Sequence, residues 1–371
     1  MEQDLPLGQI GLYIHIPWCL RRCGYCNFFA RDFRRQDFEA YYNTLLREKQ
    51  LYQERGIPAL DSVYFGGGTP SLLSGSQISG ILKDLPLSPN PEITLEVNPI
   101  QITPTFVREL ATTFVNRISL GVQSMNDEDL SYLGRRHRAA DIAPKVQMLR
   151  DSGFTNISAD FIYGIPGRTE EDIRRSLELL LALPFTHISC YLLELYEDTP
   201  LGKDADKLPG DEACEAQYHM IRSLHSEYGF AQYEISNFAR PGSESRHNLL
   251  YWEGSSYLAW GASACGFYRG LRYQNPADID KYHEYITAGR IYGDLDPDAD
   301  EIKDYIMMRL RLSKGLDLQE FSLRFQQDFL AQREQAVTRL VQLGMLIRDK
   351  RTLRLSPQAM FISNAVIAEL L

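Results

Sequence analysis

The chain has 371 residues, a formal net charge of −10, 44% hydrophobic and 24% charged residues. This composition is typical of a globular protein large enough for one large domain and a small one. The negative charge argues against a general nucleic-acid binder. No apolar run approaches the roughly 18 residues needed to span a bilayer, and the opening Met-Glu-Gln-Asp-Leu-Pro lacks a signal-peptide pattern. We therefore expect a cytoplasmic protein.

Short β-rich runs alternate with amphipathic stretches over the first half of the chain. The expected strands cover residues 11–16, 61–65, 92–97, 117–122, 156–163 and 186–192. The expected helices cover residues 37–54, 76–84, 104–113, 139–152 and 169–182. Thr169 with Asp172 three residues on resembles a capping box and marks the start of the last helix. The alternation predicts βαβ units and a parallel sheet, either barrel-like or open, whose ligands bind at the C-terminal strand ends.

The pattern changes near residue 235. Residues beyond it are rich in aromatics, Gly and Pro and show little periodicity. Further on, helices are expected at 301–313, 317–329 and 331–343, a hairpin at 345–355, and a last helix starting at Ser356-Pro357. We therefore predict three regions in the chain. They are a core domain at 1–235, a connecting segment at 236–297 and a small, mostly helical, winged-helix-like domain at 298–371.

Three cysteines follow the first expected strand in the spacing Cys-x3-Cys-x2-Cys: Cys19, Cys23 and Cys26. Three thiolates in one short loop can hold three irons of a [4Fe–4S] cluster and leave the fourth iron open for a ligand. The remaining cysteines lie far away in sequence and supply no obvious fourth ligand. His15, four residues before Cys19, keeps a zinc site open as an alternative.

Glycine and polar residues mark the ends of the next expected strands. Residues 66–70, Gly-Gly-Gly-Thr-Pro, follow the second strand, and glycines there let the backbone approach a ligand. Neither a phosphate-loop nor a dinucleotide-binding pattern surrounds them. Glu96 and Gln123 end the third and fourth strands, and Asp160 lies within the fifth. Buried polar groups need partners, and convergence of these side chains at one mouth favours a ligand over structural roles.

The cysteine motif resembles that of radical S-adenosylmethionine (SAM) enzymes, in which SAM chelates the open iron. The whole chain resembles the branch that contains oxygen-independent coproporphyrinogen III oxidase. The resemblance implies a partial (β/α)6 barrel, a [4Fe–4S] cluster on the three cysteines, and SAM. Tyr13, Gly67 and Glu96 match positions that contact the cluster-bound SAM. The positions that match contacts to a second SAM in the oxidase are Gly68, Thr69, Gln123, Arg135 and Asp160. Whether a second SAM binds here stays open.

Two departures from the oxidase argue against porphyrinogen decarboxylation. Phe28 stands where the oxidase carries a further cysteine, and with 18 residues before Cys19 we expect its long N-terminal extension to be missing. Residues 247–252, His-Asn-Leu-Leu-Tyr-Trp, match the His-Asn-x-x-Tyr-Trp string of the HemW-type haem chaperones, which also carry Phe after the third cysteine. His247 is thus a candidate haem ligand. A polar loop anchored by two core aromatics is the alternative.

The resemblance predicts a haem chaperone that binds haem and delivers it to acceptor haemoproteins, carrying the cluster and SAM, without coproporphyrinogen oxidase activity. The alternative is a radical SAM enzyme acting on a tetrapyrrole, as an oxidase or a methyltransferase. An iron–sulfur electron carrier is disfavoured, because a glycine-rich SAM site would have no purpose there. No catalytic residue is assigned. An electron donor, a second copy of the chain and a transiently contacted membrane protein stay open as partners.

Overall fold

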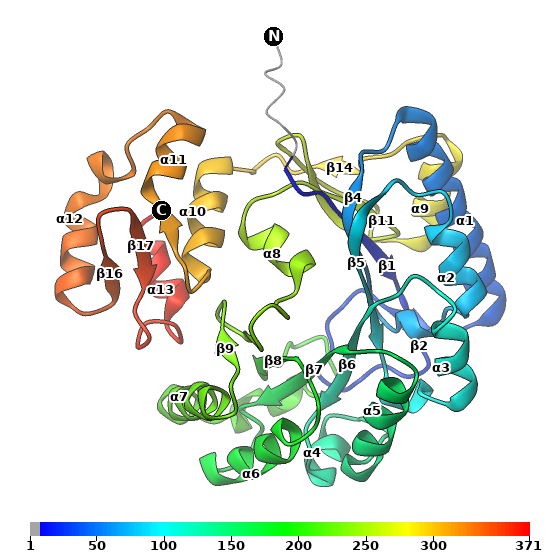
Figure 1. Ribbon diagram of the computed structural model, residues 1–371, viewed down its shortest axis with the longest axis horizontal. Coiled ribbons are helices and arrows are strands. Elements are labelled where there is room, and N and C mark those ends of the chain that lie inside the picture. Colours follow the sequence, from blue (N-terminus) through cyan, green and yellow to red (C-terminus); the bar gives the residue numbers. More distant parts are fainter. Residues whose placement is uncertain (1–7) are drawn as a thin grey trace.

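The computed structural model describes residues 8–371, so the opening residues, in which the sequence shows no signal-peptide pattern, lie outside it. Six parallel strands lie side by side in the centre of a twelve-stranded sheet (Figure 1). In order they are β1 (Gly11–Ile16), β4 (Leu60–Gly67), β5 (Leu87–Val97), β6 (Arg117–Gln123), β7 (Asn156–Tyr163) and β8 (His187–Leu192). Each matches an expected strand, which confirms the partial (β/α)6 barrel.

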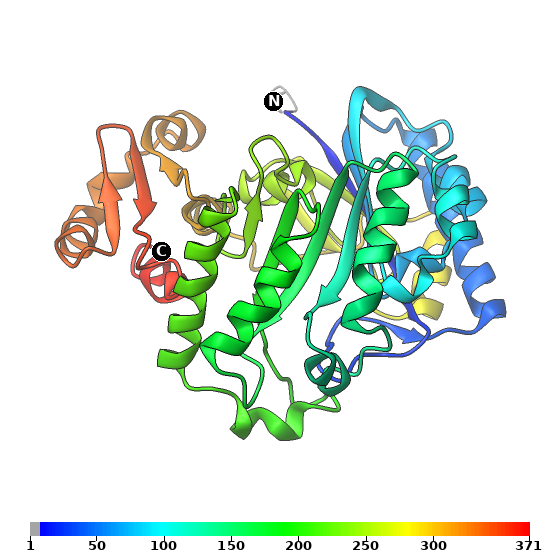
Figure 2. The ribbon, with the colours of Figure 1, turned by 60° about the horizontal axis from the view of Figure 1, so that its bottom comes forward.

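Helices form a layer outside this curved sheet (Figures 1 and 2). The α-helices of this region are α1 (Arg35–Arg55), α2 (Gly75–Leu82), α3 (Pro104–Leu110), α4 (Asp127–Tyr132), α5 (Ile142–Asp151), α6 (Glu170–Leu181) and α7 (Asp211–Glu227). Short 3-10 helices lie at Pro70–Leu72, Pro99–Gln101, Ala139–Asp141 and Gly202–Lys207. The expected capping box is present, since Thr169 and Asp172 each accept a backbone N–H of the other. The local sequence therefore places the start of α6 correctly.

The region after residue 235 contains more regular structure than its sequence predicts. Its elements, with β9 just before it, are β9 (Ala231–Gln232), β10 (Asn237–Ala239), α8 (Arg246–Trp252), β11 (Tyr257–Trp260), β12 (Cys265–Tyr268), β13 (Leu271–Gln274), α9 (Ile279–Thr287) and β14 (Asp294–Leu295). Strand β11 pairs in parallel with β1, while β12 to β14 continue the same sheet antiparallel. These strands are two to four residues long, too short for a readable alternation of polar and apolar residues.

The C-terminal region combines helices with a small sheet. Its elements are α10 (Glu301–Arg311), β15 (Leu316–Asp317), α11 (Leu318–Phe325), α12 (Phe329–Gln342), β16 (Leu346–Arg348), β17 (Thr352–Leu355) and α13 (Ser363–Ala368). The expected hairpin is β16–β17, and β15 adds a third strand. One boundary differs from the expectation: the residues after Ser356-Pro357 form turns, and the last helix starts only at Ser363. The Ser356 hydroxyl does cap a turn, because it accepts the N–H of Ala359.

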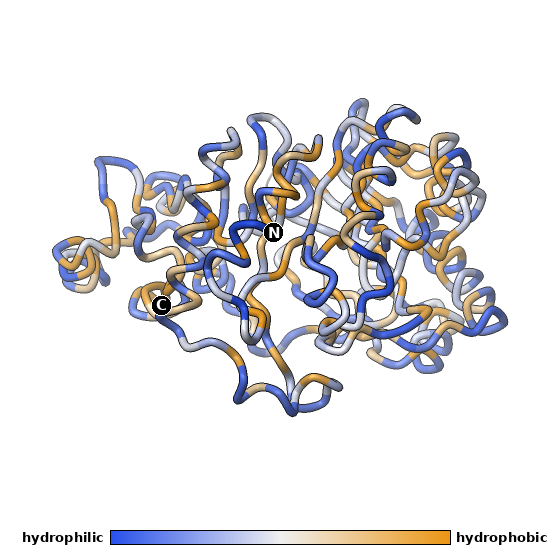
Figure 3. Tube along the Cα trace, turned by 90° about the horizontal axis from the view of Figure 1, so that it is seen from below, coloured by the Kyte–Doolittle hydropathy of each residue, from blue (hydrophilic) through white to orange (hydrophobic). Residues whose placement is uncertain are grey.

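The barrel strands bury apolar residues toward the helices and turn polar residues inward. In β6 the fully buried Ile118 and Leu120 alternate with Ser119 and Gly121, which line an internal cavity. This is the two-residue period of a strand with two different faces. Figure 3 shows hydrophobic and hydrophilic residues interspersed along the whole chain trace. The interior of the barrel is therefore a cavity whose wall combines polar and apolar groups. No helix among residues 8–371 is long and apolar enough to cross a membrane.

Candidate radical SAM site

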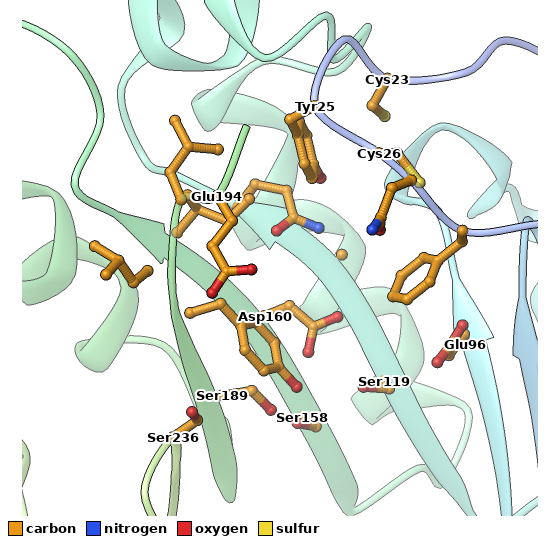
Figure 4. A pocket seen from close by; sticks show the side chains of 18 of the residues that line it. Cys23, Tyr25, Cys26, Glu96, Ser119, Ser158, Asp160, Ser189, Glu194 and Ser236 are labelled. Atoms are coloured by element: carbon orange, nitrogen blue, oxygen red, sulfur yellow. The ribbon is translucent and has the colours of Figure 1, made fainter. Parts of the chain in front are cut away.

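A cavity of about 640 Å³ runs through the barrel from the cysteine loop toward the C-terminal region. Its volume lies within the range of pockets that hold small molecules and cofactors. Figure 4 shows Cys23 and Cys26 at one end, Ser158 and Ser236 at the other, and Asp160 between them. We call these the cysteine end and the far end. The cysteine end is the edge where the parallel strands finish, as the sequence predicts.

Backbone hydrogen bonds hold the cysteine loop in place. Cys19 is the second residue of the two-residue strand β2 (Trp18–Cys19), which pairs with β3 (Arg31–Asp32). Gly24, between the other two cysteines, donates its N–H to the carbonyl of Leu133 (3.2 Å) and accepts the N–H of Leu201 (2.8 Å). A Cβ atom at Gly24 would lie 2.8 Å from the Leu201 side chain. Glycine at this position therefore lets the segments that contain Leu133 and Leu201 pack closely against the cysteine loop and hydrogen-bond to it.

Two of the thiols already accept hydrogen bonds of the kind that stabilise thiolates. The Thr69 hydroxyl donates to Cys19 Sγ (3.5 Å), and Arg135 Nη1 donates to Cys23 Sγ (3.3 Å). Burial raises the pKa of Cys19, while the Thr69 hydrogen bond lowers it. Burial likewise raises the pKa of Cys26. Hydrogen bonds to the sulfurs stabilise iron–sulfur clusters and tune them, so the donors suit a thiolate-bound cluster.

The three sulfurs fit a cluster better than a single metal ion. Among residues 8–371, no three His, Cys, Asp or Glu side chains lie where one ion could bind all of them. A cubane makes no such demand, because each thiolate binds a different iron. His15 does not fit the zinc alternative, since its Nδ1 is hydrogen-bonded to Tyr13 Oη (2.9 Å) and its Nε2 to the Phe29 carbonyl (2.9 Å). The side chains present therefore favour the cluster.

The glycine motif packs directly against the strand that leads into the cysteine loop. Gly67 has a φ of +109°, and a Cβ there would lie 2.6 Å from the His15 ring. A Cβ at Gly68 would lie 2.7 Å from the Trp18 carbonyl oxygen. Only glycine tolerates both the positive φ and this approach. The motif thus brings its own backbone to the cavity wall, where Gly67, Gly68 and Thr69 lie beside the cysteines.

Two carboxyl groups inside the barrel have raised pKa values. Removal from bulk water raises the pKa of Glu96 to about 8, with a further rise from the charge of Asp160 and an opposing hydrogen bond from the Tyr64 hydroxyl (2.9 Å). Removal from water also raises the pKa of Asp160 to about 6, against the effect of the Arg135 guanidinium. A cationic ligand between the two would favour their charged forms. The sulfonium and ammonium groups of SAM meet this requirement.

Gln123 and Arg135 shape the wall beside these carboxyls. Gln123 has a φ of +72°, rare for a residue with a side chain, and the pairing of β6 with β7 is irregular just before it. Strained residues and bulges often re-aim side chains near functional sites. Arg135 Nη2 donates to the Gly121 carbonyl (2.7 Å), and its buried Nε has no partner among the described residues. A buried donor without an acceptor is rare, and an acceptor group of a bound ligand would satisfy it.

Seven of the eight residues predicted to contact SAM line the cavity: Gly67, Gly68, Thr69, Glu96, Gln123, Arg135 and Asp160. Tyr13 lies one layer behind. Its ring stacks on Tyr64 with centroids 6.2 Å apart, and Tyr64 faces the cavity in its place. Tyr64 and Tyr25 are lining residues that the sequence did not single out. Tyr64 lies inside β4, four residues before Gly68, which also lines the cavity, so the period of two along β4 is the signal that could have found it.

Two known protein families match the chain, one in the barrel and one in the C-terminal region. The radical SAM superfamily matches residues 13–180, and the HemN C-terminal domain matches residues 296–362. The haem chaperone HemW of Lactococcus lactis is 32% identical, with 97% of this chain and 96% of the relative aligned. The haem chaperone HemW of Bacillus subtilis is 30% identical, with 97% and 98% aligned. The chain belongs to the HemW family.

A solved structure supports the fold of this HemW-family chain. Coproporphyrinogen III oxidase (HemN) from Escherichia coli superposes with a TM-score of 0.86 over 99% of this chain and 91% of its own, at 20% identity. At this identity the likeness shows a shared fold alone. Membership of the radical SAM superfamily implies the [4Fe–4S] cluster and SAM, in agreement with the side chains at the cysteine end.

Phe28 lies in the open at the cysteine end of this HemW-family cavity. Its side chain is 64% exposed, and it lines the cavity beside Cys26. Phe114 is exposed to a similar extent elsewhere on the surface, so it is the place of Phe28 at the cavity, and not its exposure, that distinguishes it. Phe28, which is predicted to distinguish the sequence from the oxidase, thus lies at the cavity rather than in the core.

His247 lies outside the cavity. Its side chain is fully buried, with Nδ1 hydrogen-bonded to Ser62 Oγ (2.8 Å) and Nε2 to Tyr251 Oη (2.7 Å). The ring stacks on Tyr64 with centroids 5.1 Å apart, and burial lowers its pKa to about 3. Neither ring nitrogen is open to an iron. This geometry fits the alternative role of a polar anchor, and haem contact by His247 stays a prediction. Asn248, the next residue of the motif, does line the cavity.

The far end contains polar residues that the sequence did not reveal. They are Arg117, Ser158, His187, Ser189, Ser236, Ser245 and Arg311. Ser158 Oγ is hydrogen-bonded to His187 Nδ1 (2.7 Å), and His187 Nε2 to Tyr233 Oη (2.8 Å). Single serines within apolar strands are weak signals, because a serine fits the core as readily as a cavity wall. Only the curvature of the sheet brings them to one place.

Proposed function

We propose that this protein is a haem chaperone, which binds haem and delivers it to acceptor haemoproteins while carrying a [4Fe–4S] cluster and SAM. The observation that carries the proposal is the alignment with haem chaperones over nearly the whole of both chains, at 30% identity or more. The likeness to the oxidase is restricted to the fold. Phe28 at the cavity mouth, in place of a further cysteine, supports the same choice.

Within this proposal the cysteine end holds the two cofactors. Cys19, Cys23 and Cys26 would hold the cluster, whose open iron supplies a site for the amino-acid part of SAM. The backbone of the glycine motif brings a polar wall close to that part, and Glu96 and Asp160 attract its positive charges. We assign no step of radical chemistry to the residues of this chain.

The test is a haem titration of the anaerobically reconstituted protein, followed by absorbance in the Soret region, with and without SAM. We expect saturable binding and transfer of haem to an apo-haemoprotein such as apomyoglobin. The same preparation is then supplied with coproporphyrinogen III, SAM and a reductant. Formation of protoporphyrinogen would support the alternative, a radical SAM enzyme acting on a tetrapyrrole, and would overturn the chaperone proposal.

A further inference from the structure

The far end of the cavity combines positive charge with apolar rings. Arg117 is the first residue of β6, and Gln123, at the cysteine end, is the last. The two are six positions apart along the strand, which at about 3.3 Å per position amounts to roughly 20 Å. A second arginine, Arg311, ends α10 and lines the same cavity. The far end therefore lies between the barrel and the C-terminal region, remote from the cysteines.

Arg117 is a buried cation whose hydrogen-bond partners are neutral. Its side chain is 2% exposed, and Nη1 donates to Asn156 Oδ1 (2.6 Å) and to the Ser243 carbonyl (3.5 Å). Its buried Nε has no partner among residues 8–371. Burial of a guanidinium is costly unless an anion or a full set of acceptors compensates it. The charge of Arg117 acts on the Asp160 carboxyl, but no carboxylate among residues 8–371 is hydrogen-bonded to the guanidinium. Its unpartnered Nε belongs to a residue of the cavity wall.

Arg311 supplies a second guanidinium, whose hydrogen-bond partner is neutral although its charge acts on the buried Glu234 carboxyl. Its Nη2 donates to Asn364 Oδ1 (2.6 Å), and its charge lies 5.7 Å from the centre of the Trp252 ring. Two arginines facing one space bind carboxylates well, since each guanidinium presents a fork of donors that matches a carboxylate. The far end thus suits a ligand with acidic groups.

The same end offers an apolar surface. Tyr218 and Phe361 line it, with ring centroids 5.7 Å apart, and Phe361 comes from the C-terminal region. Aromatic rings next to paired guanidiniums match a ligand with a flat apolar body and a carboxylate edge. A small free carboxylate would leave the rings without a partner. Haem, with its macrocycle and two propionates, has this chemistry.

We propose that the far end of the cavity is a carboxylate subsite in which Arg117 and Arg311 bind the propionates of haem. The inference rests on the proposed function, haem binding, and names the part of the cavity that recognises the ligand. Because Arg117 belongs to the barrel and Arg311 to the C-terminal region, bound haem would contact both. Separation of the two regions would then weaken its hold on the protein.

The test compares haem with haem dimethyl ester, in which the propionate charges are removed. Both are titrated into the wild-type protein, into Arg117→Gln, and into the matched control Arg246→Gln. Arg246 lies close by on α8, but its side chain is 41% exposed and does not line the cavity. We expect wild type and the control to bind haem at least about tenfold more tightly than the ester, the ratio that corresponds to about 1.4 kcal/mol.

For Arg117→Gln we expect haem affinity to fall about tenfold and ester affinity to stay within about twofold. An equal loss for both ligands, or no loss for either, would overturn the subsite and leave haem binding intact. Absence of haem binding in the wild-type protein would instead overturn the proposed function. Loss of SAM affinity in Arg117→Gln without loss of haem affinity would assign the arginine to the carboxylate of SAM, and would likewise overturn the subsite.

A second pair of variants keeps the test valid if Arg117→Gln fails to fold, which circular dichroism of each variant detects. Arg311→Gln removes the guanidinium that is only half-buried, and we expect it to reduce the preference for haem over its ester severalfold. Arg117→Lys retains the charge with fewer donors, and we expect it to recover part of that preference. If Arg311→Gln prefers haem over its dimethyl ester as strongly as the wild-type protein does, the proposal is wrong.

Discussion

The two ends of the cavity differ in how they are built. At the cysteine end, most functional side chains come from short motifs, and the backbone itself forms part of the wall through Gly67 and Gly68. At the far end, single side chains come from separate strands and from the C-terminal region, among them Arg117, Ser158 and Arg311. The first end suits a cofactor that recurs across a superfamily. The second is assembled by the fold and suits a ligand particular to this branch.

The largest effect should come from Cys23→Ser, which removes one thiolate and its hydrogen bond from Arg135. We expect loss of the broad iron–sulfur absorption near roughly 400 nm, typical of thiolate-bound clusters, and loss of SAM binding with it. Haem binding at the far end should persist. Cys265→Ser, at an exposed cysteine outside the motif, serves as the control and should keep its iron. A full iron complement in the Cys23 variant would contradict the cluster assignment.

A second experiment separates structural from binding roles for the two histidines that each bridge a serine and a tyrosine. His247→Ala leaves the hydroxyls of Ser62 and Tyr251 without a partner in the core. We expect a loss of about 2–4 kcal/mol in the free energy of unfolding, measured by denaturant titration, with haem affinity within about twofold of wild type.

His187→Ala provides the comparison, because the His187 chain of hydrogen bonds lines the cavity at its far end. A similar loss of stability is expected there, together with a change in the haem Soret spectrum. Disappearance of haem binding in a folded His247→Ala protein would confirm the predicted haem contact by His247.

Glu96→Gln tests the cysteine end by removing a carboxyl group that can become negatively charged when a cation binds, while keeping the shape of the side chain. We expect SAM affinity to fall about tenfold or more, as charged hydrogen bonds contribute about 1.5–3 kcal/mol. Haem affinity should stay unchanged, because Glu96 lies away from the far end. Glu54→Gln, on the exposed side of α1, is the control. An equal loss of SAM affinity and haem affinity would show that the two ends of the cavity do not bind their ligands independently.

The smallest effect should be the pH dependence of SAM affinity in the wild-type protein. Asp160 and Glu96 are neutral below their raised pKa values of about 6 and about 8, and negatively charged above them. Because SAM brings positive groups to this site, affinity should rise severalfold from pH 5 to pH 9. Isothermal titration at each pH, with iron content measured in parallel, checks this. In Glu96→Gln the rise in SAM affinity near pH 8 should disappear. A pH profile of SAM affinity identical to that of wild type would show that Glu96 is not the group whose ionisation causes this rise.

The local sequence determined the parallel core, the cysteine loop and the glycine motif. Each of these is a contiguous pattern whose physical cause is local: the two-residue period of a strand, the spacing of three thiols, the freedom of glycine. The short strands β11 to β14 were missed, because two to four residues carry no period and their place beside β1 depends on contacts far along the chain. For the same reason the start of the last helix was predicted at Ser356-Pro357, whereas the helix begins at Ser363.

The tertiary structure alone decided which polar side chains meet at the far end of the cavity. It placed Arg117 and Arg311, nearly 200 residues apart in the sequence, at one end of it, and it enclosed His247 in the core although its motif suggested an open ligand. A sequence motif states which residues occur together along the chain. Whether a side chain faces a ligand or the core depends on the curvature of the sheet and on what packs against it, and both are set by long-range contacts.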